Sequence, residues 1–77
     1  MKKGRVQTAV ELVEEIRTLY RGRDERDFIG GITCDVELNT VLNSMTEQES
    51  EEFSNTKQGQ EINNLIQTFQ LAELVNF

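Results

Sequence analysis

Groups that could catalyse a reaction are scarce in this chain of 77 residues, which has one cysteine and no histidine. Cys34 is the single candidate nucleophile, and a thiol needs a neighbouring base or cation to become a reactive thiolate. Without histidine, the commonest general base is missing. Cys34 also extends the apolar face that Leu38 and Leu42 would form on a helix, so we expect a packed, structural thiol. The composition therefore predicts that the protein is not an enzyme.

Carboxylates are abundant, but their spacing does not separate them from an ordinary solvated helix face. A calcium loop needs acidic or amide ligands at alternating positions, then a glycine and a closing glutamate. Asp24, Asp27 and Gly30 lack that spacing. A structural zinc site needs several cysteine or histidine ligands, which the chain does not contain. We therefore expect no metal and no other cofactor.

One short stretch contains residue types that bind phosphate. The backbone amides of a glycine pair ahead of a helix can surround an anion, and Gly30 and Gly31 form such a pair. Three arginines lie just upstream and could add positive charge. Because the stretch lacks the spacing of a P-loop, a plain turn between helices is the favoured interpretation. The residues that would hold an anion are Arg21, Arg23, Arg26, Gly30, Gly31 and Thr33.

Charge is unevenly distributed along the chain, whose formal net charge is −6. Residues 1–27 carry seven basic and six acidic groups, whereas residues 28–77 carry one lysine against eight acidic groups. This balance opposes direct contact with nucleic acid and with anionic membranes, and it suits attraction to a basic protein surface. Simple solubility is the competing and favoured explanation of the acidity. A partner-binding acidic surface would consist of Glu47, Glu49, Glu51 and Glu52.

Apolar residues recur three and four apart over 5–21, 35–45 and 57–76, and this spacing predicts helices. These helices would position the groups described above. Proline, which breaks helices, is absent. The first stripe is wide enough to touch two neighbouring elements, and Gly22 provides a natural end to that helix.

Two shorter segments lie between these helices. Thr46 and Glu49 have the spacing of a capping box, which predicts a short acidic helix over 46–55 held by a single aromatic residue. Asp24 can cap another short helix, which the glycine pair would end in a turn or break. A short strand over 28–34 is the alternative.

Together these elements predict an all-α protein, a small irregular bundle of three to four helices in a single domain spanning 1–77. A chain this short buries only roughly 60–65% of the surface that its unfolded form exposes, and one cysteine cannot form an internal disulfide. A partner chain is the remaining aid to stability. Near Gln70 the apolar pattern changes, so the helix either breaks or is apolar all round. Residues expected to mediate self-association are Leu71, Leu74, Val75 and Phe77.

These observations favour binding over catalysis. We expect an acidic helical module that binds another protein, regulates or inhibits a larger protein machine, and forms a homodimer or higher homo-oligomer. The chain is similar to small proteins of phages and mobile elements in size and charge only. The alternative is a homo-oligomeric binder, or sponge, of a small anionic ligand such as a nucleotide. A free cysteine and the lack of an apolar signal segment predict a cytoplasmic protein, and no stretch is apolar enough to span a membrane.

Overall fold

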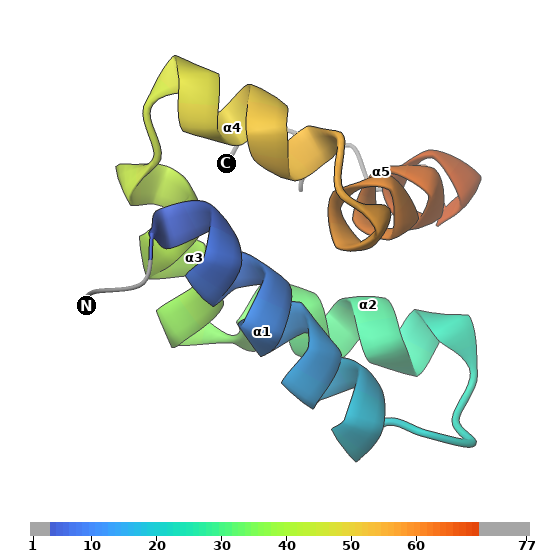
Figure 1. Ribbon diagram of the computed structural model, residues 1–77. Helices are drawn as coiled ribbons and strands as arrows, with labels where there is room; N and C mark the ends of the chain where they lie inside the picture. Colours follow the sequence, from blue (N-terminus) through green and yellow to red (C-terminus); the bar gives the residue numbers. More distant parts are fainter. Residues whose placement is uncertain (1–3, 70–77) are drawn as a thin grey trace.

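The computed structural model describes residues 4–69, and this range folds into five α-helices with no strand among the described residues. The all-α fold class is confirmed, although the bundle has more helices than the three to four predicted. In chain order they are α1 (Arg5–Leu19), α2 (Glu25–Cys34), α3 (Val36–Ser44), α4 (Glu47–Ser54) and α5 (Lys57–Phe69). In Figure 1, α4 and α5 form an upper layer over α1, α2 and α3.

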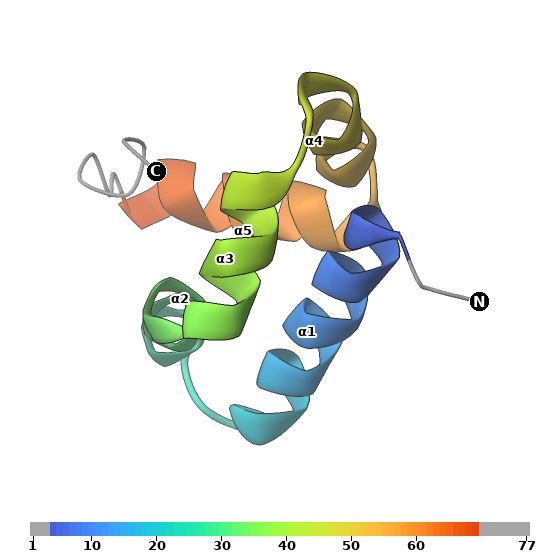
Figure 2. The same cartoon turned by 90° about the vertical axis from the view of Figure 1, so that its left-hand side faces the viewer.

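The apolar stripe of α1 lies at the centre of the core. Rather than the two neighbours expected, α1 contacts all four other helices, and α1 and α3 lie side by side (Figure 2). The buried residues of α1 are Ala9, Leu12, Val13 and Ile16. The chain leaves α1 through Gly22, whose φ of +82° lies in the left-handed region that glycine adopts without strain.

Short side-chain caps begin the next two helices. The Asp24 carboxylate accepts hydrogen bonds from the amides of Arg26 and Asp27, at 2.9 and 3.1 Å, and the Asp35 carboxylate accepts one from the Leu38 amide at 2.8 Å. These bonds satisfy amides that the start of a helix leaves without partners. The cap predicted at Asp24 is confirmed. For α3 the sequence allows either Thr33 or Asp35 as the cap, and the structure shows Asp35.

The prediction of a turn or break at Gly30 and Gly31 is wrong, because α2 continues through both glycines. The alternative strand over 28–34 is wrong for the same reason. Three side chains of α2 are buried: Phe28, Ile29 and Ile32. Each fully buried apolar side chain of this size contributes about 1.5–3 kcal/mol, whereas each glycine costs about 1 kcal/mol in a helix. Tertiary burial therefore outweighs the local preference to break.

The same continuation overturns the expectation of a packed thiol, because Cys34 is exposed. Cys34 is the last residue of α2 and does not extend the apolar face of α3. It follows the buried Ile32 by two residues, a rotation of about 200° around the helix, and so lies on the opposite side.

The hairpin of α4 and α5 brings two helix backbones into close contact. Phe53 is the buried residue of α4, with 7% of its surface exposed, so one aromatic residue does hold the acidic helix. The Thr56 hydroxyl accepts a hydrogen bond from the Gly59 amide at 3.0 Å. A Cβ atom on Gly59 would clash with the Phe53 carbonyl oxygen and lie 2.9 Å from the Ser54 Cα. Glycine is therefore required where α5 begins.

The described part of α5 covers Lys57–Phe69 of the helix predicted over 57–76. Ile62 and Leu65 of its apolar stripe are buried. The change of pattern near Gln70 lies outside the described residues, and so do the residues predicted to mediate self-association: Leu71, Leu74, Val75 and Phe77.

Two glycine substitutions should change stability in opposite directions. Gly59→Ala inserts a methyl group against backbone atoms and should destabilise the fold by about 1–3 kcal/mol or more. Gly30→Ala adds a methyl group with no atom within 4 Å inside α2, and should stabilise it by about 0.5–1 kcal/mol. Thermal unfolding measures both, at about 4–8 °C per kcal/mol. A stabilised Gly59→Ala protein would contradict the close approach of α4 and α5.

Candidate functional site

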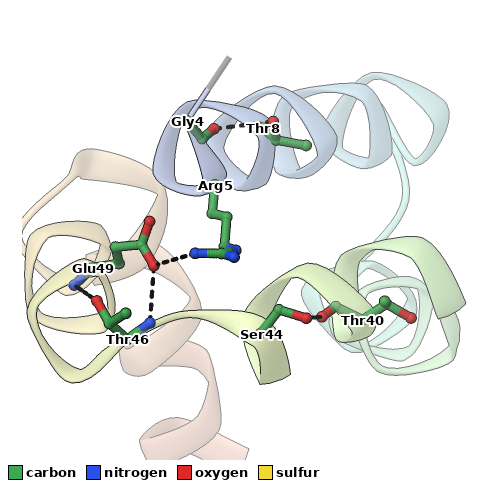
Figure 3. Close-up of polar contacts among 7 residues, drawn as sticks. All are labelled: Gly4, Arg5, Thr8, Thr40, Ser44, Thr46 and Glu49. Atoms are coloured by element: carbon green, nitrogen blue, oxygen red, sulfur yellow. Dashed lines mark hydrogen bonds and ion pairs between the residues drawn. The ribbon is translucent and has the colours of Figure 1, made fainter. Parts of the chain in front are cut away.

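The first turn of α4 is held by a reciprocal pair of hydrogen bonds. The Thr46 hydroxyl accepts from the Glu49 amide at 3.1 Å, and the Glu49 carboxylate accepts from the Thr46 amide at 2.9 Å. Figure 3 shows both contacts. The predicted capping box is confirmed. It fixes the start of a helix whose sequence is otherwise almost entirely polar.

Glu49 also joins α4 to the start of α1. Arg5 Nη1 donates to Glu49 Oε1 at 3.0 Å (Figure 3). The hydrogen bond from the Thr46 amide holds the pKa of Glu49 below its usual value of 4.5; partial burial opposes this effect and Arg5 reinforces it. Only 26% of the Glu49 side chain is exposed, and its carboxylate is bonded to Arg5 and to the Thr46 amide. Glu49 therefore contributes little to an outer acidic surface.

The other three predicted acidic residues lie on the outside of α4. Glu47, Glu51 and Glu52 are all exposed, and at 100° per residue they fall within an arc of about 140°. Phe53 and Glu49 are four residues apart and occupy the inward side of the same helix. The structure therefore divides the predicted set of four glutamates into an outer three, which we call the acidic face, and one internal tether.

An open hollow of about 420 Å³ lies beside the acidic face, between α4 and the start of α1. Its lining residues are Gly4, Arg5, Val6, Thr46, Gln48, Glu49 and Glu52. Glu52 thus connects the acidic face with this hollow, whose two carboxylates exceed its one arginine. A cationic side chain would find an electrostatically favourable edge here.

The predicted anion-binding residues are not brought together as expected. Arg21 and Arg23 lie before α2, Gly30 and Gly31 lie in its interior, and Thr33 lies in its last turn. The Thr33 hydroxyl donates to the Ile29 carbonyl at 2.7 Å. The Arg26 amide is bonded to Asp24, and the Arg23 guanidinium lies 5.8 Å from the Tyr20 ring centre. The turn that would have exposed an amide nest is absent.

Sequence reasoning missed Arg17, which connects three helices. Arg17 donates to Glu61 of α5 at 2.8 Å and to Glu25 of α2 at 3.3 Å, and its guanidinium lies 3.7 Å from the Phe28 ring centre. Burial acts to lower the pKa of Arg17, but the bonds to Glu61 and Glu25 outweigh it and raise the pKa. The signal available in the sequence was an arginine four residues after Val13, on the edge of the apolar stripe.

A small hollow of about 90 Å³ beside Arg17 is electrically balanced. It is lined by Val13, Glu14, Arg17, Lys57, Gln58 and Glu61, so its two cations face two carboxylates. Gln58 donates to Glu14 across it. Within residues 4–69, no three acidic, cysteine or histidine side chains group together as a metal site, and none of the described helices combines the length and hydropathy needed to span a membrane.

Comparison of the chain with models of known families, with curated proteins and with solved structures finds no match. The candidate site therefore rests on its own geometry.

The charge of Glu49 should stabilise the fold at neutral pH but not in acid. Its pKa is lower in the folded chain than the usual value of 4.5, so ionised Glu49 stabilises the fold above that pH and loses this effect as the pH falls through the folded-state value. Glu49→Gln keeps an accepting oxygen but removes the charge. Its thermal midpoint should be lower than that of the native chain at pH 7, and the two midpoints should converge in strong acid.

Glu47→Gln is the control, because Glu47 lies in the same first turn and has no side-chain partner among the described residues. If the thermal midpoint of Glu49→Gln stays equally far below that of the native chain in strong acid, the charge of Glu49 does not have this role.

Proposed function

We propose that this protein is a small acidic helical module that binds another protein and thereby regulates or inhibits a larger machine. In this proposal it acts in the cytoplasm, without a cofactor and without catalysis, and docks through the acidic face on a basic surface of its partner. The observation that carries the proposal is the division of roles on α4. Glu47, Glu51 and Glu52 remain exposed on one side, while Phe53 and Glu49 anchor the other.

Rigidity supports this use of α4. The capping box, the Arg5–Glu49 bond and the buried Phe53 hold the helix in place, so docking would order few additional backbone groups, and ordering is a main cost of association. Exposed carboxylates that have no partner within residues 4–69 attract a basic surface at long range and speed the encounter. The same charges keep the chain away from nucleic acid phosphates.

The alternative function, a homo-oligomeric sponge for a small anion, has less support. It depended on an amide nest at Gly30 and Gly31, and both residues lie inside α2. Thermal shift against nucleotides at millimolar concentration is its direct test, since a ligand that binds the folded chain raises the thermal midpoint.

Neutralising the acidic face should release the partner. A tagged chain is incubated with source-cell lysate at 0.1 M and at 1 M salt, where the screening length falls from about 10 Å to about 3 Å. A protein retained at low salt should be lost at high salt. It should also be lost at low salt from the triple variant Glu47→Gln, Glu51→Gln and Glu52→Gln. Mass spectrometry measures the retained proteins.

The matched control neutralises three exposed carboxylates on other helices: Glu15→Gln, Asp27→Asn and Glu37→Gln. It has the same net charge as the first triple variant and should retain the partner. Equal loss from both variants would attribute binding to overall charge, and retention by both would remove the acidic face from the proposal.

Self-association is the second part of the proposal and rests on the apolar sequence after Gln70. Leu71→Asp combined with Leu74→Asp should convert an oligomer into a folded monomer, since charges in an apolar interface lose their hydration without gaining partners. Light scattering after size-exclusion chromatography measures the mass, and circular dichroism measures the helix content. Loss of helix content throughout the chain would instead place these leucines in the core of the single chain.

A further inference from the structure

The open hollow beside α4 is large enough for a long side chain. Its volume of about 420 Å³ lies at the lower end of the range of roughly 300–1,000 Å³ that ligand pockets occupy. It is formed by the start of α1 and the first two turns of α4. Gly4 at its edge has no side chain, and a Cβ atom there would meet no atom within 4 Å. This edge of the hollow is therefore open to a group that enters from outside.

The two carboxylates of the hollow differ in whether they already have a partner. Glu49 is bonded to Arg5 at 3.0 Å (Figure 3), so the charge of the one arginine in the hollow is compensated within the molecule. Glu52 is exposed, and its carboxylate has no hydrogen-bond or ion-pair partner among residues 4–69. The hollow therefore carries one uncompensated negative charge, which a single monovalent cation would neutralise.

A second acceptor and an apolar surface accompany Glu52. Gln48 and Glu52 are four residues apart in α4, which places them on the same side of the helix. Gln48 is exposed, and its side-chain oxygen can accept a hydrogen bond. Val6 of α1 also lines the hollow and packs, partly buried, against the core. The hollow thus combines a carboxylate, an amide oxygen and an apolar side chain.

Arginine is the side chain that uses all three of these features. Its planar guanidinium can donate two parallel hydrogen bonds to the Glu52 carboxylate and another to the Gln48 oxygen. Its aliphatic stem can cover Val6 while the charged end stays beside water. A guanidinium is also more weakly hydrated than the ammonium group of lysine, so it loses less hydration when it enters a partly enclosed site. Arginine is, in addition, enriched among the residues that anchor protein interfaces.

We propose that this hollow accepts one arginine side chain of the partner protein, and that Glu52 binds its guanidinium. The inference rests on the proposed function, because it specifies where the basic surface of the partner inserts into this chain. Glu52 belongs to both the hollow and the acidic face. An arginine bound there would bring neighbouring basic groups of the partner next to Glu47 and Glu51.

A small probe tests the hollow without the partner. The probe is arginine blocked at both ends, N-acetyl-arginine methylamide, and citrulline blocked in the same way is its uncharged control of similar shape. In NMR titrations of the full chain at constant salt, the arginine probe should shift the amides of residues 4–6 and 46–52, and the shifts should saturate. The citrulline probe should bind at least about tenfold more weakly.

Three results of this titration would overturn the proposal. The first is equal binding of the two probes, and the second is a set of shifts spread evenly over all exposed carboxylates. The third is a shift of the same amides when the protein alone is diluted, since that would assign the hollow to a second copy of the chain.

A variant that blocks the hollow tests the same site from the side of the protein. Gln48→Arg places a cation of the chain itself one helical turn from Glu52, and should weaken binding of the arginine probe at least about tenfold. Gln67→Arg is the matched control, because it makes the same chemical change at an exposed residue of α5 that does not line the hollow. It should leave the affinity unchanged. Equal weakening by both variants would attribute binding of the probe to net charge and overturn the proposal.

The lysate experiment separates this inference from the proposed function. If both hold, the partner is lost from Gln48→Arg and from the triple variant of the acidic face, and Gln67→Arg retains it. If the triple variant loses the partner but Gln48→Arg retains it, docking through the acidic face stands and the arginine anchor is wrong. If the arginine probe binds the hollow but no retained protein depends on the acidic face, the guanidinium site stands and the proposed function is wrong.

Discussion

Burial of one apolar stripe organises the molecule. α1 contacts the other four helices, and its side chains Ala9, Val13 and Ile16 are almost wholly buried. The chain has 77 residues, and each remaining helix contributes buried side chains to the one core cluster that this stripe enters. The glycine pair of α2 stays helical for this reason, because a break there would uncover a share of the common core.

Polar bonds around α1 refine the arrangement that burial creates. Arg17 reaches both α2 and α5, and Arg5 reaches α4. These bonds give the angles between helices a preferred value while adding little to stability, since partly exposed ion pairs are weak. These ion pairs also involve only some of the acidic residues. Glu49 and Glu61 are paired with arginines, whereas Glu47, Glu51 and Glu52 have no such pairing among the described residues, and this difference distinguishes the acidic face.

The parts of the structure that follow from local bonds could be predicted from the sequence. The caps at Asp24, Asp35 and Thr46 each depend on residues two or three positions away, and all three are present. The parts that depend on distant residues could not be predicted from the sequence. A continuous helix through Gly30 and Gly31 could be predicted only from the packing of Phe28 and its neighbours in the core, and the exposure of Cys34 follows from that continuation. Arg17 and Glu61 are 44 residues apart, so no spacing rule connects them. Within the candidate site, residue types were predictable, but the separation of Glu49 from Glu47, Glu51 and Glu52 required the position of Arg5.

The central place of α1 has a consequence during synthesis of the protein. α1 is made before the other four helices, and Ile62 and Leu65, which complete its cover, are made more than 40 residues later. At about 5–20 residues per second, the stripe waits roughly 2–9 s for that cover. During this interval the stripe of α1 lacks the cover that α5 provides in the folded protein. Its apolar side chains are therefore the surface of the nascent chain that a chaperone would bind.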